Sequence, residues 1–240
     1  MNQPPGLLST AAPDVQAGRP KTEVSLTRVG VTGVEKVIRV EAVGDAGPQL
    51  FFAQLQCFVD LNPRQAGAHM SRFEEIVNEA IDEVVLSETL KAEQLAARIA
   101  ERVRDRQGGL RAEVALTARY PETVPTPVTD NHTQEIYTLY GTAVASEHGT
   151  RTLTGVEAQG MTACPCAQEM ISASARERLD ELGYSPSQIE EIIGAVPVAT
   201  HNQRGIGTLH LGLPEDSDLE IDARDLLRIC LLYTSDAADE

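Results

Sequence analysis

The chain has little cysteine, few basic residues and no long apolar run. Four cysteines among 240 residues do not make the disulfide framework of a secreted domain, so a close thiol pair indicates metal binding or reactivity. No stretch reaches the roughly 18 apolar residues that a membrane span needs, and residues 1–18 lack the basic start and apolar middle of a secretory signal. These absences predict a cytoplasmic protein with no membrane partner.

The deficit of basic residues argues against a second class of partner. The chain holds 36 acidic and 20 basic residues, which gives a formal net charge of −16. Nucleic acids are polyanions that a basic surface attracts, so we expect no binding to them. A small anionic substrate stays compatible with this charge, because a few basic groups in a cleft outweigh a distant, salt-screened acidic surface.

The pattern of apolar residues predicts strands and helices in about equal measure, and 42% hydrophobic residues suffice for a substantial core. Expected strands cover residues 24–43, 50–59, 112–120, 134–146, 151–159 and the stretch after His201; the 134–146 segment also fits a helix, but we favour a strand. Expected helices cover residues 71–84, 91–106, 168–182 and 186–194. The order strand, strand, helix, helix, strand therefore occurs twice, which indicates an internal duplication. Residues 1–20, rich in proline and glycine, are interpreted as a flexible arm.

Two serines are expected to begin helices. Ser71 and Glu74 have the spacing of a capping box, and Ser185 is followed by proline and, three positions on, by Gln188.

Cys164-Pro165-Cys166 carries the most direct chemical signal. Two thiols one residue apart, with the imidazole of His201 from a distant segment, are ligand types that hold zinc or ferrous iron, and fewer than four protein ligands leave a position for water. On spacing alone, two buried cysteines explain the pair equally well, and a structural role is the better interpretation of the histidine. Cys57, within an apolar run, is expected in the core.

Polar residues gather in three further places. Arg64, His69, Ser71 and Arg72 lie between a strand and a helix start, where backbone amides and the positive helix end favour a phosphate, although a solvated loop explains the spacing equally well. Gln134 and Glu135 either line a site or only face solvent. Gln203 and Arg204 either contact a metal ligand or substrate, or belong to a hydrated turn. The remaining histidines have no partner pattern and are assigned no role: His132, His148 and His210.

Several segments together carry a family resemblance: Pro13-Asp14-Val15-Gln16, Arg28-Val29-Gly30-Val31, Val59-Asp60-Leu61, Gly67-Ala68-His69-Met70-Ser71-Arg72, Thr133-Gln134-Glu135-Ile136-Tyr137, the thiol motif and Thr200-His201-Asn202-Gln203-Arg204-Gly205-Ile206-Gly207. In this order and spacing they resemble the archaeal GTP cyclohydrolase of the methanopterin pathway and, more distantly, the bacterial type IB GTP cyclohydrolase of folate synthesis. The helical stretch between Cys166 and His201 is similar to the archaeal branch, since the bacterial enzymes have a much shorter link there.

The resemblance implies an α+β tunnelling fold (T-fold) with two strand-strand-helix-helix-strand units per chain. It also implies a homo-oligomer, a dimer or tetramer, with sites between subunits. The implied reaction converts GTP into 7,8-dihydroneopterin 2′,3′-cyclic phosphate, formate and diphosphate, the first step of tetrahydromethanopterin-type pterin biosynthesis. Ferrous iron is the implied cofactor, with zinc or manganese as alternatives.

Site residues follow from the same resemblance. Cys164, Cys166 and His201 are the implied metal ligands, of which Cys164 and His201 are the ones expected to act in catalysis. Water activated at the metal would attack C8 of guanine, open the imidazole ring and release formate. The expected substrate contacts are Arg64, His69, Ser71, Arg72, Gln134, Glu135, Gln203 and Arg204.

The sequence departs from the family pattern at its end. Family members continue with a segment that supplies a metal-binding carboxylate and a glutamate that anchors guanine, and residues 230–240 match neither. We therefore expect a catalytic domain over residues 21–229 that lacks its C-terminal part, followed by a non-native tail over residues 230–240.

Two alternatives stay open. A type IB enzyme would yield 7,8-dihydroneopterin triphosphate for folate synthesis, and a non-enzymatic binding protein would use the thiols and imidazole as a structural zinc clamp. A tunnelling-fold nitrile reductase would use a single cysteine and NADPH, and its single cysteine does not explain the two thiols in this histidine context.

Overall fold

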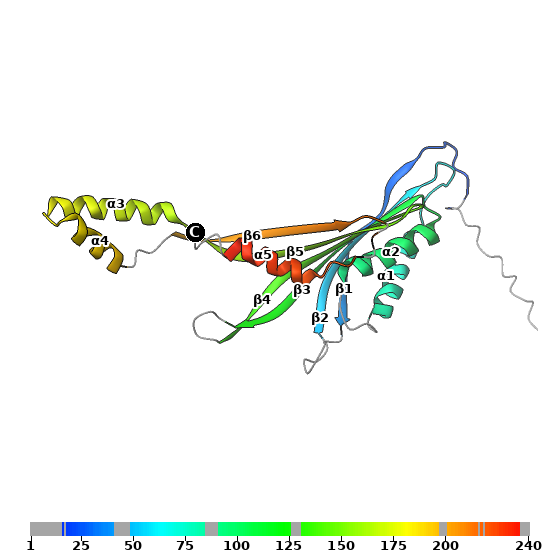
Figure 1. Cartoon of the computed structure of the whole chain (residues 1–240). Helices are drawn as coiled ribbons and strands as arrows, with labels where there is room; N and C mark the ends of the chain where they lie inside the picture. Colours follow the sequence, from blue (N-terminus) through cyan, green and yellow to red (C-terminus); the bar gives the residue numbers. More distant parts are fainter. Residues whose placement is uncertain are drawn as a thin grey trace, which may run out of the picture. The chain divides into compact units, whose positions relative to one another are not determined.

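The computed structural model describes residue 16 and residues 18–40, 49–84, 91–125, 131–196, 201–215, 217 and 219–235. The elements follow in the order β1 (Leu26–Val40), β2 (Gln49–Leu61), α1 (Met70–Val84), α2 (Ala92–Gln107), β3 (Arg111–Pro125), β4 (His132–Ser146), β5 (Gly149–Cys164), α3 (Pro165–Glu181), α4 (Pro186–Ala195), β6 (His201–Leu213) and α5 (Ala223–Ser235) (Figure 1). The strands form a six-stranded sheet in the order β1-β2-β3-β4-β5-β6. This confirms the α+β class and the twice-repeated order of elements, to which α5 is added.

The hairpin of β1 and β2 is antiparallel, with Val29 opposite Val59 and Ile38 opposite Phe51. Every second residue of β2 is buried, which is the period of a strand with one face on the core. Cys57 is among them at 0% exposure, as expected, and burial raises the pKa of its thiol to about 12.

The chain divides into two compact units. The first comprises residues 1–118, 140–153 and 212–218; the second comprises residues 119–139, 154–211 and 219–240. In the first unit, α1 packs against α2 and β1, and α2 packs against β2. The apolar side of α1 is buried through Phe73, Ile76 and Val77, whose three- and four-residue steps are those of a helix with one face on the core. Gly108, at φ 64°, ends α2 in the left-handed conformation that favours glycine.

Of the two helix starts predicted at serines, the one at Ser71 is wrong and the one at Ser185 is confirmed. Helix α1 begins at Met70, so Ser71 lies inside the first turn and not at the N-cap. The loop before α1 is held by other contacts, described below, and the helix therefore starts one residue earlier than the capping pattern indicates. Ser185 is the N-cap of α4, and its N–H donates to Gln188 Oε1 at 3.0 Å.

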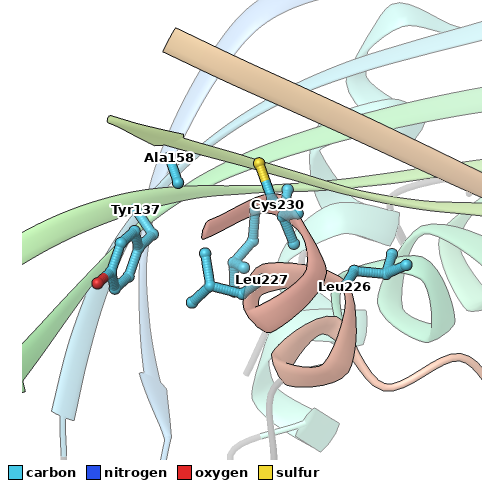
Figure 2. Close-up of a cluster of buried hydrophobic side chains, with 7 residues drawn as sticks. Tyr137, Ala158, Leu226, Leu227 and Cys230 are labelled. Carbon is cyan, nitrogen blue, oxygen red and sulfur yellow. The ribbon is translucent and has the colours of Figure 1, made fainter. Parts of the chain in front are cut away.

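In the second unit, α5 lies against strands β4 and β5 (Figure 2). Leu226, Leu227 and Cys230 of this helix are buried with Tyr137 and Ala158 of the sheet. The thiol of Cys230 is 5% exposed and donates to the Gly207 carbonyl of β6 at 3.3 Å. The expected domain boundary after residue 229 lies within α5, and the assignment of residues 230–240 as a non-native tail stays a prediction.

The described helices include none that is both long enough and apolar enough to cross a membrane.

Candidate functional site

Strands β5 and β6 are antiparallel neighbours with a register that three contacts define. The Gly155 position lies directly under the imidazole of His210, and Leu153 meets Gly212. Thr208 Oγ1 and Glu157 Oε2 are 3.5 Å apart. Each step of two residues forward on β5 is therefore matched by a step of two residues back on β6, which is the pairing of an antiparallel ladder.

Continued to the strand ends, this register sets Cys164 opposite His201. Cys164 is the last residue of β5 and His201 is the first residue of β6. Directly opposite residues of antiparallel strands have Cβ atoms about 4.5–5.5 Å apart and project from the same face of the sheet. The side chains of both residues lie outside the described part of the structure, and the side chains that are described contain no cluster of three metal-ligating groups.

Cys166 lies on the other side of a strand-to-helix junction. The run that carries the two thiols is not a free turn, because Pro165 and Cys166 are the first two residues of α3. Proline is well suited to this first helical position, since its missing N–H would have no intrahelical partner there. Cys166 is exposed in the first turn of the helix, where the helix dipole favours a negatively charged group.

The face of the sheet that carries α5 has a floor of small residues next to this junction. Thr138 Oγ1 and Glu157 Oε1 are 3.5 Å apart, and the same register sets Glu135 of β4 beside Gly160 of β5 and Gly205 of β6. Glycine has no side chain, so no Cβ covers the backbone of β5 and β6 at these two positions beside Glu135.

Tyr137 holds the Glu135 carboxylate. Its hydroxyl donates to Glu135 Oε2 at 2.6 Å, and the tyrosine is 2% exposed. Burial, and then the hydrogen bond to this carboxylate, raise the pKa of Tyr137, so its phenol keeps its proton and stays a donor. The orientation of Glu135 is thus fixed by a buried group.

The other expected contacts of this unit divide between the two faces. Side chains alternate along a strand, so Gln203 shares the face of Glu135 and of the Cys164 and His201 positions. Gln134 and Arg204 occupy the intervening positions and lie on the opposite face, where both are exposed. The register therefore places Glu135 and Gln203 on the same face as the Cys164 position at the end of β5, whereas Gln134 and Arg204 lie on the other face.

In the first unit, the four residues of the expected anion site lie in the loop between β2 and α1, which holds Arg64 and His69, and in the first turn of α1, which holds Ser71 and Arg72. Arg64 and Ser71 are exposed, and His69 and Arg72 are half-buried. The backbone N–H of Arg64 donates to Asn62 Oδ1 at 3.0 Å. Gly67 and Ala66 donate to the carbonyls of Gln16 and Gly18, so part of the expected N-terminal arm lies against this loop.

Comparison with known proteins shows the family to which the chain belongs. The family model of the type I GTP cyclohydrolase folE2 matches residues 12–238. The chain belongs to this family. It is therefore an enzyme of the GTP cyclohydrolase class.

Relatives of this GTP cyclohydrolase are archaeal proteins named GTP cyclohydrolase MptA. The chain is 36% identical to that of Methanococcus aeolicus over 87% of its own length and 69% of the relative's length. It is 36% identical to that of Haloarcula marismortui over 92% and 71% of the two lengths. For Methanococcus maripaludis strain C5, the identity is 38% over 84% and 66% of the lengths.

Some motif residues of the cyclohydrolase have structural roles that the sequence did not indicate. Arg28 adopts φ 54°, a strained conformation for a residue with a side chain, at an irregularity in the β1–β2 pairing. Its N–H donates to Asp60 Oδ1 at 2.8 Å, and its guanidinium lies over the Phe58 ring and binds Glu113 at 2.5 Å. Arg111 binds the same glutamate at 2.8 Å. These ionic contacts fix the start of β1 against β2 and β3.

Gln107 is a further residue that sequence reasoning missed. A polar residue at the end of a helix ordinarily faces solvent, and no motif marks it. The side chain is nevertheless 2% exposed and bonds to His69 of the anion loop.

Proposed function

We propose that this cyclohydrolase is metal-dependent and converts GTP into 7,8-dihydroneopterin 2′,3′-cyclic phosphate, formate and diphosphate, as the first step of tetrahydromethanopterin-type pterin biosynthesis. The relatives named GTP cyclohydrolase MptA support GTP as the substrate. The β5–β6 register, which sets Cys164 opposite His201, is the observation that supports the metal site.

Cys164 and His201 would hold the metal, with Cys166 close enough in sequence to serve as a further thiol. A thiolate and an imidazole suit ferrous iron, our proposed cofactor, and they also accept zinc or, less readily, manganese. A cation bound there supplies Lewis-acid activation of water for hydrolysis of the guanine ring. The chain's own part would be to supply the two donors from neighbouring strands.

The purine would lie on the small-residue floor beside Glu135. The carboxylate, held by Tyr137, accepts hydrogen bonds from N–H groups of guanine, and Gln203 offers a further polar contact on the same face. We propose Arg64, His69 and Arg72, with Ser71 in the first turn of α1, as contacts for the triphosphate of a substrate bound between subunits.

A homo-oligomer would account for the residues on the opposite face. One chain cannot direct Gln134 and Arg204 at the same substrate as Glu135 and Gln203, because the sheet separates them. In a T-fold dimer or tetramer with sites between subunits, the second face of one chain would contact a substrate held by its neighbour. We place this assembly in the cytoplasm.

The experiment incubates anaerobic, iron-loaded protein with GTP and follows pterin absorbance and formate release. Mass spectrometry of the product then separates the cyclic phosphate from a triphosphate. A triphosphate product would favour type IB chemistry. Metal binding without any conversion of GTP would refute the proposal and favour a structural zinc clamp.

A further inference from the structure

The amide side chain of Gln107, the last residue of α2, joins this helix to the loop before α1. Its Oε1 accepts the His69 N–H at 2.9 Å, and its Nε2 donates to the His69 carbonyl at 2.8 Å. A primary amide that both accepts from and donates to one residue holds that residue's backbone in a single orientation, because rotation of either group breaks both bonds. Gln107 is 2% exposed, so the loss of either bond leaves a buried polar atom of its amide without a partner.

The carbonyls at the end of α2 hold the same loop. The last carbonyls of a helix have no partner within the helix, and here the loop supplies one for each of two residues. Gln65 Nε2 donates to the Gln107 carbonyl at 2.8 Å and to the Gly67 carbonyl at 3.0 Å. Arg72 Nη1 donates to the Arg106 carbonyl at 3.1 Å. The loop is therefore fixed at its start, at its end and in the first turn of α1.

We propose that Gln107 is a positioning residue that keeps the anion loop in the conformation that receives the substrate triphosphate. This inference rests on the proposed GTP site at Arg64, His69 and Arg72. A loop that is ordered before binding loses little conformational entropy when the anion arrives, so its affinity is higher than that of a loop that must order itself. Gln107 touches no substrate and acts only through the His69 backbone.

The test replaces the amide by an isosteric carboxylate. Gln107→Glu keeps the acceptor for the His69 N–H, but it loses the donor and sets a negative oxygen against the His69 carbonyl. The matched control is Ile99→Val, which removes one methylene group from a buried residue of the same helix, away from the loop. Binding of inorganic tripolyphosphate to the full chain is measured by titration calorimetry at pH 7.5.

We expect the carboxylate variant to bind tripolyphosphate about tenfold more weakly, the effect of one lost buried hydrogen bond, and the control to stay within about twofold of the wild type. The KM for GTP should rise by the same factor with kcat little changed. Inhibition by guanosine, which has no phosphate, should not change. A general loss of structure would weaken the two ligands alike.

Lowering the pH provides a rescue. A buried carboxyl has a raised pKa, and its protonated form is a donor that rebuilds the pair with the His69 carbonyl. The ratio of the variant's dissociation constant to that of the wild type should therefore fall as the pH falls through this pKa. Protonation of tripolyphosphate affects both dissociation constants equally, so it does not change this ratio. If the carboxylate variant does not fold, Gln107→Met, which keeps the length without polar atoms, takes its place at pH 7.5.

Three results would overturn the inference: no tripolyphosphate binding by the wild type, unchanged affinity in the variant, or equal losses in variant and control. A wild type that binds tripolyphosphate but does not convert GTP would refute the proposed function. In that case a selective loss in Gln107→Glu would still support the positioning role.

Discussion

Moving the two proposed metal ligands together along β5 and β6 tests the strand register directly. In a background that carries Cys164→Ala and His201→Ala, the pair Thr162→Cys and Gln203→His rebuilds a thiol and an imidazole one row further into the sheet. The register makes positions 162 and 203 opposite neighbours on the same face as the original pair. The matched control replaces Gln203→His by Asn202→His, which sets the imidazole on the other face.

The expected magnitude follows from the geometry of one tetrahedral ion. A thiolate at about 2.3 Å and an imidazole at about 2.0 Å lie about 3.5 Å apart, which side chains from opposite strand positions can span. Groups that only support a metal ligand already change the affinity by about 10- to 100-fold, so the background should lose at least about 100-fold. The rebuilt pair should recover most of this loss, and the control pair should recover none.

The assay is competition with a chromophoric chelator for cobalt, whose thiolate absorption band also reports a sulfur ligand. Equal cobalt affinity of the rebuilt and control pairs would refute the register. Wild-type affinity in the background would show that Cys164 and His201 do not hold the metal.

Three further predictions concern stability and reactivity. Gly141→Ala should lower the free energy of unfolding by about 1–3 kcal/mol in urea titrations, because an added Cβ would lie 2.2 Å from the α2 backbone; Gly194→Ala, with nothing within 4 Å, should not destabilise. Burial raises the pKa of Glu113, but hydrogen bonds from two arginines outweigh it and lower that pKa overall; its stabilisation is therefore complete above the unfolded pKa of about 4.3 and is lost as pH falls through the folded value. Glu113→Gln should flatten the decline of the urea midpoint at acid pH, and an unchanged slope would contradict this. Iodoacetamide at pH 8 should label the exposed Cys166 and spare the buried Cys57, as read by peptide mass spectrometry; equal labelling would show that the burial is wrong.

Local patterns were sufficient to predict most of the elements. The alternation on β3 and the three- and four-residue steps on α1 depend on which side of each element faces the core, and this side is encoded by the residues of the element itself. The start of α1 was missed by one residue, because the contacts that hold the preceding loop come from the far end of α2 and leave no mark in the local sequence.

The residue types at the proposed metal site were evident from the sequence, since two thiols one residue apart and an imidazole are ligand types for zinc and ferrous iron. How these residues lie relative to one another in space was not evident from the sequence. Cys164 and His201 are separated by α3 and α4, and only the pairing of β5 with β6 sets them opposite each other. The same pairing decided that Glu135 and Gln203 share a face from which Gln134 and Arg204 are excluded, because a one-residue step along a strand reverses the side of the sheet. The sequence by itself thus determined which chemical groups the chain carries and which elements hold them. Tertiary structure decided which groups meet, since strand register and the burial of Gln107 arise from contacts between segments far apart in the chain.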